Sequence, residues 1–110
     1  MGVTKTEYFT EKQNKIAAIM KALAHPARIA IIDFLIKSDK CICGDIVNEI
    51  GLAQPTISQH LKELKIAGII KGNIEGAAIC YCINEKAFSE FQKYLTGIFG
   101  KLEKQKGNCC

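Results

Sequence analysis

Two amphipathic helices are predicted in the first third of the chain, because hydrophobic side chains recur there at helical spacing. The first is expected over about residues 10–24, and the second runs from Pro26 to a polar turn near residues 38–40. Proline suits the first position of a helix and not its interior, so His25-Pro26 separates the two. The positions expected to face the core are Ile16, Ile19, Met20 and Leu23, then Ile29, Ile32, Leu35 and Ile36.

Two further helices joined by a tight turn are predicted next. The first covers about residues 44–50, and Gly51 is expected to end it in a left-handed conformation. The second begins at Gln54-Pro55 and ends before Gly68. Their inward positions are Ile46, Val47 and Ile50, then Ile57, Leu61 and Leu64. Two helices with glycine at the start of the connecting turn form the helix-turn-helix pattern.

The hydrophobic period then changes from helical to strand-like. A short apolar run at residues 69–71, a turn-rich stretch at 72–76 and an alternating segment at 77–83 predict a β-hairpin. Asn84 is expected to cap a final helix over about residues 85–102. The buried stripe of that helix is expected to be Phe88, Phe91, Leu95, Ile98 and Leu102. A mainly α winged helix-turn-helix fold is therefore predicted, with one domain at residues 1–103 and a cysteine-ending tail at 104–110.

Composition agrees with a single small intracellular domain. The chain has 110 residues, 48% of them hydrophobic, and a formal net charge of +4, so a packed core is expected and intrinsic disorder is not. No apolar run approaches the ~20 residues of a membrane span, and no export signal follows the N-terminus. We therefore expect a cytoplasmic protein without a membrane partner.

The second helix of the helix-turn-helix carries a polar outer face suited to double-stranded DNA. Glutamine pairs with adenine, serine and threonine contact bases or phosphates, and lysine neutralises phosphate. An ordinary solvated helix face is the alternative, but the following hairpin favours DNA recognition. Two polar residues of the hairpin are placed either to touch the DNA backbone or simply to face solvent. The predicted DNA-binding residues are Gln54, Thr56, Ser58, Gln59 and Lys62 on the helix and Lys71 and Asn73 on the hairpin.

The two histidines are expected to be structural. His25 precedes the proline that starts the second helix, where a cap or a helix–helix contact is the usual role. His60 lies within the predicted DNA-reading helix, where a DNA contact, a switch and a packed polar residue are the open roles, and a lone histidine is more often structural.

Six cysteines fall in three close pairs, Cys41/Cys43, Cys80/Cys82 and Cys109/Cys110. A disulfide within such a pair would be strained, and without an export signal the expected setting is a reducing cytosol. Clustered thiols there indicate thiol chemistry or metal binding. Strand alternation predicts that Cys80 and Cys82 lie together on the outward face of the hairpin, as surface thiols.

Residues 23–32, Leu-Ala-His-Pro-Ala-Arg-Ile-Ala-Ile-Ile, and residues 54–70, from Gln-Pro-Thr-Ile-Ser-Gln-His-Leu to Gly-Ile-Ile, resemble motifs of the ArsR/SmtB metalloregulatory repressors. The resemblance covers about residues 16–102. It implies a homodimer that binds inverted-repeat operator DNA and releases it when a metal or metalloid binds. Ala53 departs from the family, which often has a capping serine there.

The resemblance also implies a sensing site, because arsenic- and cadmium-sensing members carry a Cys-x-Cys pair where this chain has Cys41 and Cys43. Soft thiolates select thiophilic ions, and arsenite or antimonite is the expected inducer, with Cd(II), Pb(II) or Zn(II) as alternatives. Ile46 stands where many arsenic sensors have a third cysteine, so Cys109 or Cys110 is predicted to supply the third thiolate. Cys80, Cys82 or a small-molecule thiol remain alternatives, and so does the tail pair acting alone as a separate two-thiol site for a methylated arsenical.

Zinc on the last helix is disfavoured, because residues 84–102 contain no histidine.

Two other functional classes compete with a metal-responsive repressor. A thiol redox enzyme would require Cys-x-x-Cys near a βαβ unit or a cysteine beside a base, and neither pattern is present; no enzymatic activity is therefore predicted. A repressor of the same fold could instead use its thiols to sense oxidants or reactive sulfur by forming a disulfide or polysulfide.

Overall fold

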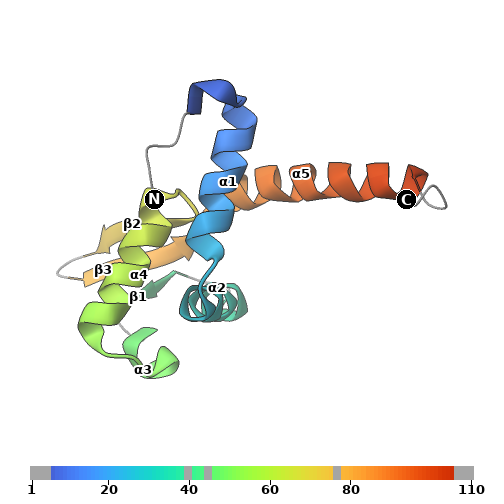
Figure 1. The fold of residues 1–110 in the computed structure, drawn as a ribbon. Coiled ribbons are helices and arrows are strands. Elements are labelled where there is room, and N and C mark those ends of the chain that lie inside the picture. The colour runs from blue at the N-terminus through green and yellow to red at the C-terminus, as the bar shows by residue number, and fades with distance from the viewer. Residues whose placement is uncertain (1–5, 39–40, 44–45, 76–77, 106–110) are drawn as a thin grey trace.

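The computed structural model describes residues 6–38, 41–43, 46–75 and 78–105. A small three-stranded sheet lies beside a group of short helices, and one long helix extends away from both (Figure 1). The elements, in order, are η1 (Thr6–Tyr8), α1 (Glu11–Leu23), α2 (Pro26–Ser38), β1 (Ile42–Cys43), α3 (Ile46–Ile50), α4 (Gln54–Ile66), β2 (Ile70–Glu75), β3 (Ala78–Ile83) and α5 (Glu85–Lys104).

The predicted helices are confirmed, with local signals that explain their ends. Thr10 and Gln13 form a capping box before α1, in which each side chain accepts a hydrogen bond from the other's backbone N–H at 3.0 Å. Gly51 and Gly68, with φ of 80° and 78°, end α3 and the turn after α4 in the left-handed conformation that glycine tolerates. The predicted start of α3 at residues 44–45 lies outside the described residues.

The core forms where α1, α2, α3 and α4 meet the base of β2. Ile31, Ile57, Leu64, Ile69 and Ile70 are among its fully buried side chains. All three inward positions predicted for α4 are buried, and so is Ile46 of α3.

The predicted stripes of α1 and α2 are partly wrong. Met20, Ile29 and Ile36 are exposed, while Ala22 and Ile31 are buried in their place. Helices α1 and α2 contact each other as well as α4, so the buried face turns toward both neighbours and departs from one straight stripe.

The sheet differs from the predicted hairpin in two ways. β2 extends through residues 72–75, which were expected to form the turn, and pairs with β3 from Ile70↔Ile83 to Glu75↔Ala78. A third strand, β1, was not predicted, and it pairs antiparallel with the other edge of β3. The strand order is therefore β1-β3-β2, with β3 in the centre.

Asn84 links the hairpin to α5 in a way that the sequence did not indicate. It occupies the predicted N-cap position of α5 but makes no side-chain capping hydrogen bond. Its Nδ2 instead donates to the carbonyl oxygen of Gly68 at 2.8 Å, and its backbone N–H donates to the carbonyl of Ile69 at 2.9 Å. The end of β3 is thereby fixed to the entry of β2, which sets the direction in which α5 departs.

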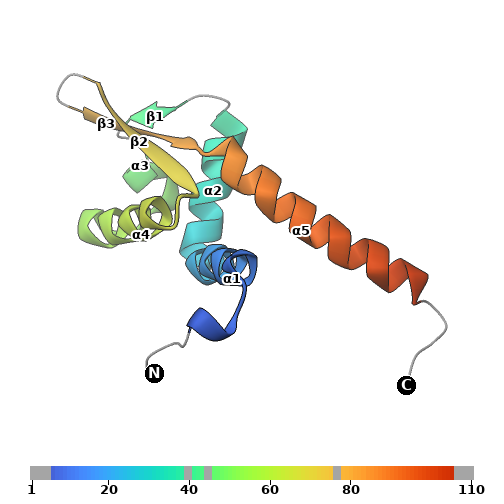
Figure 2. The same ribbon diagram turned by 90° about the horizontal axis from the view of Figure 1, so that it is seen from above.

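Helix α5 projects from the body of the protein, as both views show (Figures 1 and 2). Only its first turns pack against the core, through Phe88 and Phe91, and none of its residues is fully buried. An ion pair of 2.6 Å between Lys15 of α1 and Glu90 joins the two helices and lowers the pKa of the glutamate. The radius of gyration, 16.8 Å, exceeds the ~13 Å expected of a compact chain of this length. No helix in the described part of the chain is long and apolar enough to cross a membrane.

A cluster of Arg28, His25 and His60 fixes α4 against the junction of α1 and α2. Arg28 Nε donates to His60 Nδ1 at 3.1 Å, and an Arg28 terminal nitrogen donates to the carbonyl of Ala22 at 3.2 Å. The His25 ring lies 4.4 Å from the His60 ring, and its Nδ1 accepts from the backbone N–H of Ala27 at the start of α2. The structural roles predicted for both histidines are confirmed.

This cluster predicts that stability falls in mild acid. Burial, with the nearby His25 and Arg28 charges, lowers the pKa of His60 below its usual 6.5. The folded state therefore favours neutral His60. This contribution to stability is complete above about pH 6.5 and is lost as the pH falls toward the lowered pKa. Urea denaturation of wild type at several pH values between 7 and 5 should show the decline.

The variant His60→Gln keeps an acceptor for Arg28 and removes the titration, so its stability should change less over the same range. His25→Asn, which keeps a capping acceptor and retains His60, should still show most of the wild-type dependence. An unchanged dependence in His60→Gln would contradict the assignment.

Candidate DNA interface and cysteine cluster

Helix α4 presents the predicted polar face to solvent. Its inner side is held by Ile57, Leu61 and Leu64 in the core and by His60 on Arg28, so the opposite side is free of packing contacts. All five predicted DNA-binding residues of this helix, Gln54, Thr56, Ser58, Gln59 and Lys62, are exposed. Ala53 is the N-cap of α4 and provides no side-chain capping bond, as the sequence comparison with capping serines implied.

Two of these amides are oriented by neighbours one turn along the helix. Gln54 Nε2 donates to Ser58 Oγ at 3.3 Å, and Gln59 Nε2 donates to Glu63 Oε1 at 3.1 Å. In each bond the amide nitrogen is the donor, and the amide oxygen takes no part. The helix therefore offers both donors and acceptors along one exposed edge.

The two predicted hairpin residues lie on β2, not in a turn. Lys71 is exposed and lies opposite Cys82 in the β2–β3 register. Asn73 is also exposed, but its Nδ2 lies 3.7 Å from Cys82 Sγ, as a hydrogen-bond donor. Asn73 therefore contacts Cys82 as well as facing solvent, and this contact was not predicted from the sequence.

Strand β1 brings two of the cysteine pairs together. In the β1–β3 register Ile42 faces Tyr81 and Cys43 faces Cys80. The next position in this register places Cys41 beside Cys82, with their Cα atoms 4.4 Å apart, and the two sulfurs form a disulfide. A disulfide within a pair was expected to be strained, and one between pairs was not predicted. The matching Cys-x-Cys spacing in two segments was the available signal, because antiparallel strands with equal spacing align both cysteines.

The predicted surface position of Cys80 is wrong. Its exposed fraction is 1%, whereas Ile79, which was expected to face the core, is 48% exposed. Cys80 lies in the central strand, opposite Cys43 in the β1 register and Asn73 in the β2 register, and it is itself disulfide-bonded. Cys82 is half-buried and Cys41 is exposed, so the disulfide lies at the edge of the sheet.

The described part of the chain does not include the other two predicted ligands. Cys109 and Cys110 lie outside the part of the chain that the structure describes. Within that part, no group of three or more histidine, cysteine, aspartate or glutamate side chains is close enough to hold a metal ion.

Comparison with known proteins places this geometry in a family. Residues 25–71, which run from the Arg28 cluster to the start of β2, match the family described as "Bacterial regulatory protein, arsR family". Over 84 residues the chain is 40% identical to an HTH-type transcriptional regulator of Methanocaldococcus jannaschii, covering 76% of this chain and 93% of that protein. The chain belongs to the ArsR family of transcriptional regulators.

Other members of the ArsR family match over most of their length. The biofilm growth-associated repressor of Xylella fastidiosa is 30% identical over 99 residues, 90% of this chain and 86% of that protein. The crystal structure of the Xylella fastidiosa repressor BigR superposes with a TM-score of 0.62 and 27% identity, over 84% of this chain and 95% of that one.

The winged helix-turn-helix fold is confirmed by a solution structure from Mycobacterium bovis described as homodimeric. It has a TM-score of 0.66 and 24% identity, and covers 96% of this chain and 95% of that one. Because the family consists of DNA-binding regulators, the prediction that the chain is not an enzyme also holds.

The disulfide predicts a large difference in stability between the oxidised and reduced protein. It closes a loop with a sequence separation of 41. A disulfide of this loop length contributes about 4 kcal/mol in the chain-entropy model, and measured values are typically about 2–4 kcal/mol. Urea denaturation with and without a dithiol reductant should show a loss of at least that size, because Cys80 is also disulfide-bonded and the reductant breaks its bond as well.

The double variant Cys41→Ser/Cys82→Ser is the matched control, because it lacks only this disulfide. The loss of stability that the reductant causes should be smaller in this variant than in wild type by about 2–4 kcal/mol. An equal response in both proteins would show that the Cys41–Cys82 bond does not stabilise the fold.

Proposed function

We propose that this ArsR-family regulator is a cytoplasmic, dimeric repressor whose operator DNA is released by a thiophilic metalloid, arsenite or antimonite. The observation that best supports a thiol-based sensor is that Cys41 and Cys82 lie in direct contact, while Cys43 and Cys80 are partners in the same strand register. This site lies between α4, which carries the proposed DNA contacts, and α5, which carries the proposed dimer interface. Cys43 precedes α3, which contacts α4, while Cys82 precedes α5 by three positions.

The proposed DNA contacts are the exposed residues of α4, Gln54, Thr56, Ser58, Gln59 and Lys62, with Lys71 and Asn73 on β2. The glutamines read bases, and Lys62 and Lys71 contact phosphates. An inverted-repeat operator follows from a two-fold symmetric dimer, with half-sites about one helical turn apart.

The proposed dimer forms through α1 and α5. Phe99 and Leu102 are 63% and 57% exposed, and Leu95 and Ile98 are only half-buried. A projecting helix with this apolar stripe is the kind of surface that a soluble monomer avoids. The Mycobacterium bovis neighbour is described as homodimeric, which supports a dimer.

The proposed metalloid ligands are Cys41 and Cys43, with a third thiolate from Cys109 or Cys110. The position of Cys82 beside Cys41 makes it a second source for that third ligand. Binding requires the Cys41–Cys82 bond to be reduced first, because a sulfur in a disulfide is not a thiolate. Cd(II), Pb(II) and Zn(II) are the alternative inducers, since they also bind thiolates.

A second candidate is a repressor that responds to oxidants or reactive sulfur through its thiols. The specific observation in its favour is the Cys41–Cys82 disulfide itself, which joins two sulfurs that reduction would separate. Arsenite and an oxidant would then act on the same cysteines with different products, a thiolate complex or a covalent sulfur–sulfur bond.

Substitutions on α4 separate base reading from phosphate contact. Gln54→Ala or Gln59→Ala should weaken binding to a specific operator by ~1–3 kcal/mol and relax the preference at one base pair. Lys62→Ala should weaken specific and random DNA alike and flatten the dependence of affinity on salt. Fluorescence anisotropy with both DNAs at several salt concentrations measures these effects. Equal losses on both DNAs for the glutamine variants would show that they do not read bases.

Release by arsenite should depend on the cysteine cluster and not on the DNA-binding face. In reduced protein, Cys41→Ser or Cys43→Ser should bind operator as tightly as wild type and fail to release it when arsenite is added. Titration of the operator complex with As(III), Sb(III), Cd(II), Pb(II) and Zn(II) identifies the inducer. Release that persists in the Cys41→Ser/Cys43→Ser double variant would refute the assignment.

The third thiolate is identified by X-ray absorption of the As(III) complex. Deletion of Cys109 and Cys110 should lower the count of bound sulfurs from three to two if the tail supplies a ligand. Cys82→Ser should do so instead if the sheet supplies it. Three sulfurs in both variants would exclude both sources and leave Cys80 or a small-molecule thiol.

A further inference from the structure

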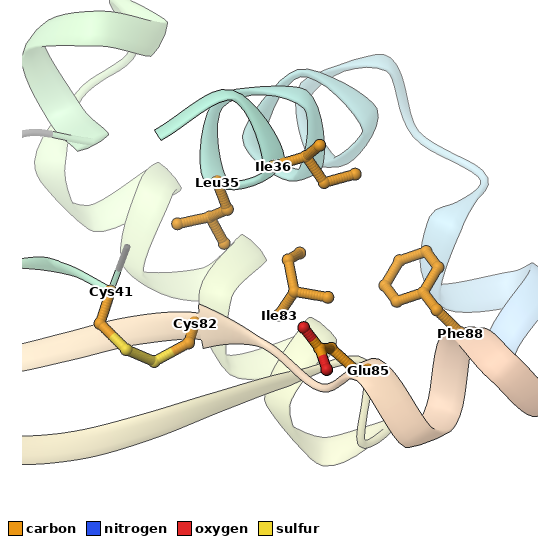
Figure 3. A pocket seen from close by; sticks show the side chains of 7 residues that line it. All are labelled: Leu35, Ile36, Cys41, Cys82, Ile83, Glu85 and Phe88. Carbon is orange, nitrogen blue, oxygen red and sulfur yellow. A yellow bond between two sulfur atoms is a disulfide. The ribbon is translucent and has the colours of Figure 1, made fainter. Parts of the chain in front are cut away.

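A pocket of about 560 Å³ opens beside the Cys41–Cys82 disulfide (Figure 3). The end of α2 forms one wall and the junction of β3 with α5 forms another. Four lining side chains are apolar, namely Leu35, Ile36, Ile83 and Phe88. The disulfide and Glu85 are the other described residues that line it, so both sulfurs are in reach of a molecule in the pocket.

The lining determines which molecules fit. The volume lies within the ~300–1,000 Å³ of ordinary small-molecule sites, which are mostly apolar with few polar groups. Among the lining residues that the structure describes, Glu85 is the only ionisable one apart from the cysteines, and its carboxylate repels anions. The pocket therefore suits a small neutral molecule with an apolar body, whose reactive group would lie against sulfur.

The two sulfurs differ in their surroundings. Asn73 Nδ2 donates a hydrogen bond to Cys82 Sγ at 3.7 Å. Such a donor stabilises negative charge on the sulfur that it touches. Cys41 is the more exposed of the two. Cys82 is thus the better placed to attack, and Cys41 to attack in turn the sulfur of Cys82.

We propose that the reduced Cys41–Cys82 pair reacts with organic hydroperoxides, whose apolar substituent occupies this pocket. The Cys82 thiolate attacks the terminal peroxide oxygen, the O–O bond breaks, and the alkoxide leaves and takes a proton to become the alcohol. Cys82 is then a sulfenic acid, oxidised by two electrons. The Cys41 thiol attacks that sulfur and displaces hydroxide, which leaves as water with the thiol proton. One hydroperoxide and two thiols thus give one alcohol, one water and the disulfide present in the structure.

This inference rests on the redox candidate of the proposed function and names its oxidant. It does not depend on the metalloid assignment, since its first readout is a chemical product and not release of DNA.

The test compares an apolar with a small polar oxidant on the full chain. Protein reduced with a dithiol and freed of reductant is mixed with cumene hydroperoxide or hydrogen peroxide. Mass spectrometry of digested samples then follows the Cys41–Cys82 linked peptide over time. Each rate is divided by the rate of the same oxidant with N-acetylcysteine, which removes the intrinsic reactivity of the peroxides. We expect the corrected rate to favour cumene hydroperoxide by about tenfold or more, a preference within reach of burying one aromatic ring.

Two variants on the same helix show whether the pocket creates this preference. Ile36 is 59% exposed and lines the pocket, so Ile36→Glu introduces charge there without disturbing the core. Ile29, two turns earlier on α2, is 44% exposed and is not among the lining residues. The preference should fall toward one in Ile36→Glu and remain in Ile29→Glu. In Cys41→Ser, which lacks the second thiol, dimedone should trap a sulfenic acid on Cys82.

Three results would overturn the proposal: equal corrected rates for both oxidants in wild type, a preference that survives Ile36→Glu, or no sulfenic acid on Cys82 in Cys41→Ser. Arsenite titration of operator complexes formed by Ile36→Glu provides the separate arm. Arsenite release in this variant without the hydroperoxide preference shows that the two functions are distinct. Failure of hydroperoxide chemistry in wild type with intact arsenite release removes this inference and leaves the metalloid proposal standing.

Discussion

The pairing of β3 with a strand on each side is the interaction on which the cysteine cluster of this protein depends. β1 consists of two residues, Ile42 and Cys43, too few to be stable as a strand by themselves. It persists because β3 already pairs with β2 and offers its other edge, and because a disulfide joins Cys41 to Cys82 next to the paired residues. A segment between two helices is thereby fixed to the strand that leads into α5.

The orientation of α4 depends on a different contact, made by the single arginine of the chain. Arg28 holds both the carbonyl that ends α1 and the His60 ring within α4. A lysine would not reproduce this, because its ammonium lacks the planar set of donors that serves two acceptors in fixed directions. The same residue thus explains why α4 has one defined angle relative to α1 and α2, and why its polar face points outward.

The helices could be predicted from the sequence because their information is local: hydrophobic spacing, a proline at a helix start, and glycines at two helix ends. The exposed residues of α4 followed from the same spacing, once Ile57, Leu61 and Leu64 were assigned to the core. Strand β1 could not be found this way, since two residues carry no period. The meeting of Cys41 with Cys82 is a property of register between segments 41 positions apart. The contact of Asn73 with Cys82 is likewise diagonal across two strands.

Few residues separate the cysteine cluster from α4 and α5. Cys82 and α5 are separated by Ile83 and Asn84, and Asn84 is tied to Gly68, two residues after the end of α4. We propose that forming or breaking the Cys41–Cys82 bond shifts the edge of β3, and with it the position from which α5 departs. Because α5 projects by most of its length, a small rotation at its base produces a large displacement at its far end. Allosteric couplings of about 1–3 kcal/mol suffice to change affinity by one to two orders of magnitude, and the proposed interface along α5 would turn such a rotation into a change in the spacing of two α4 helices.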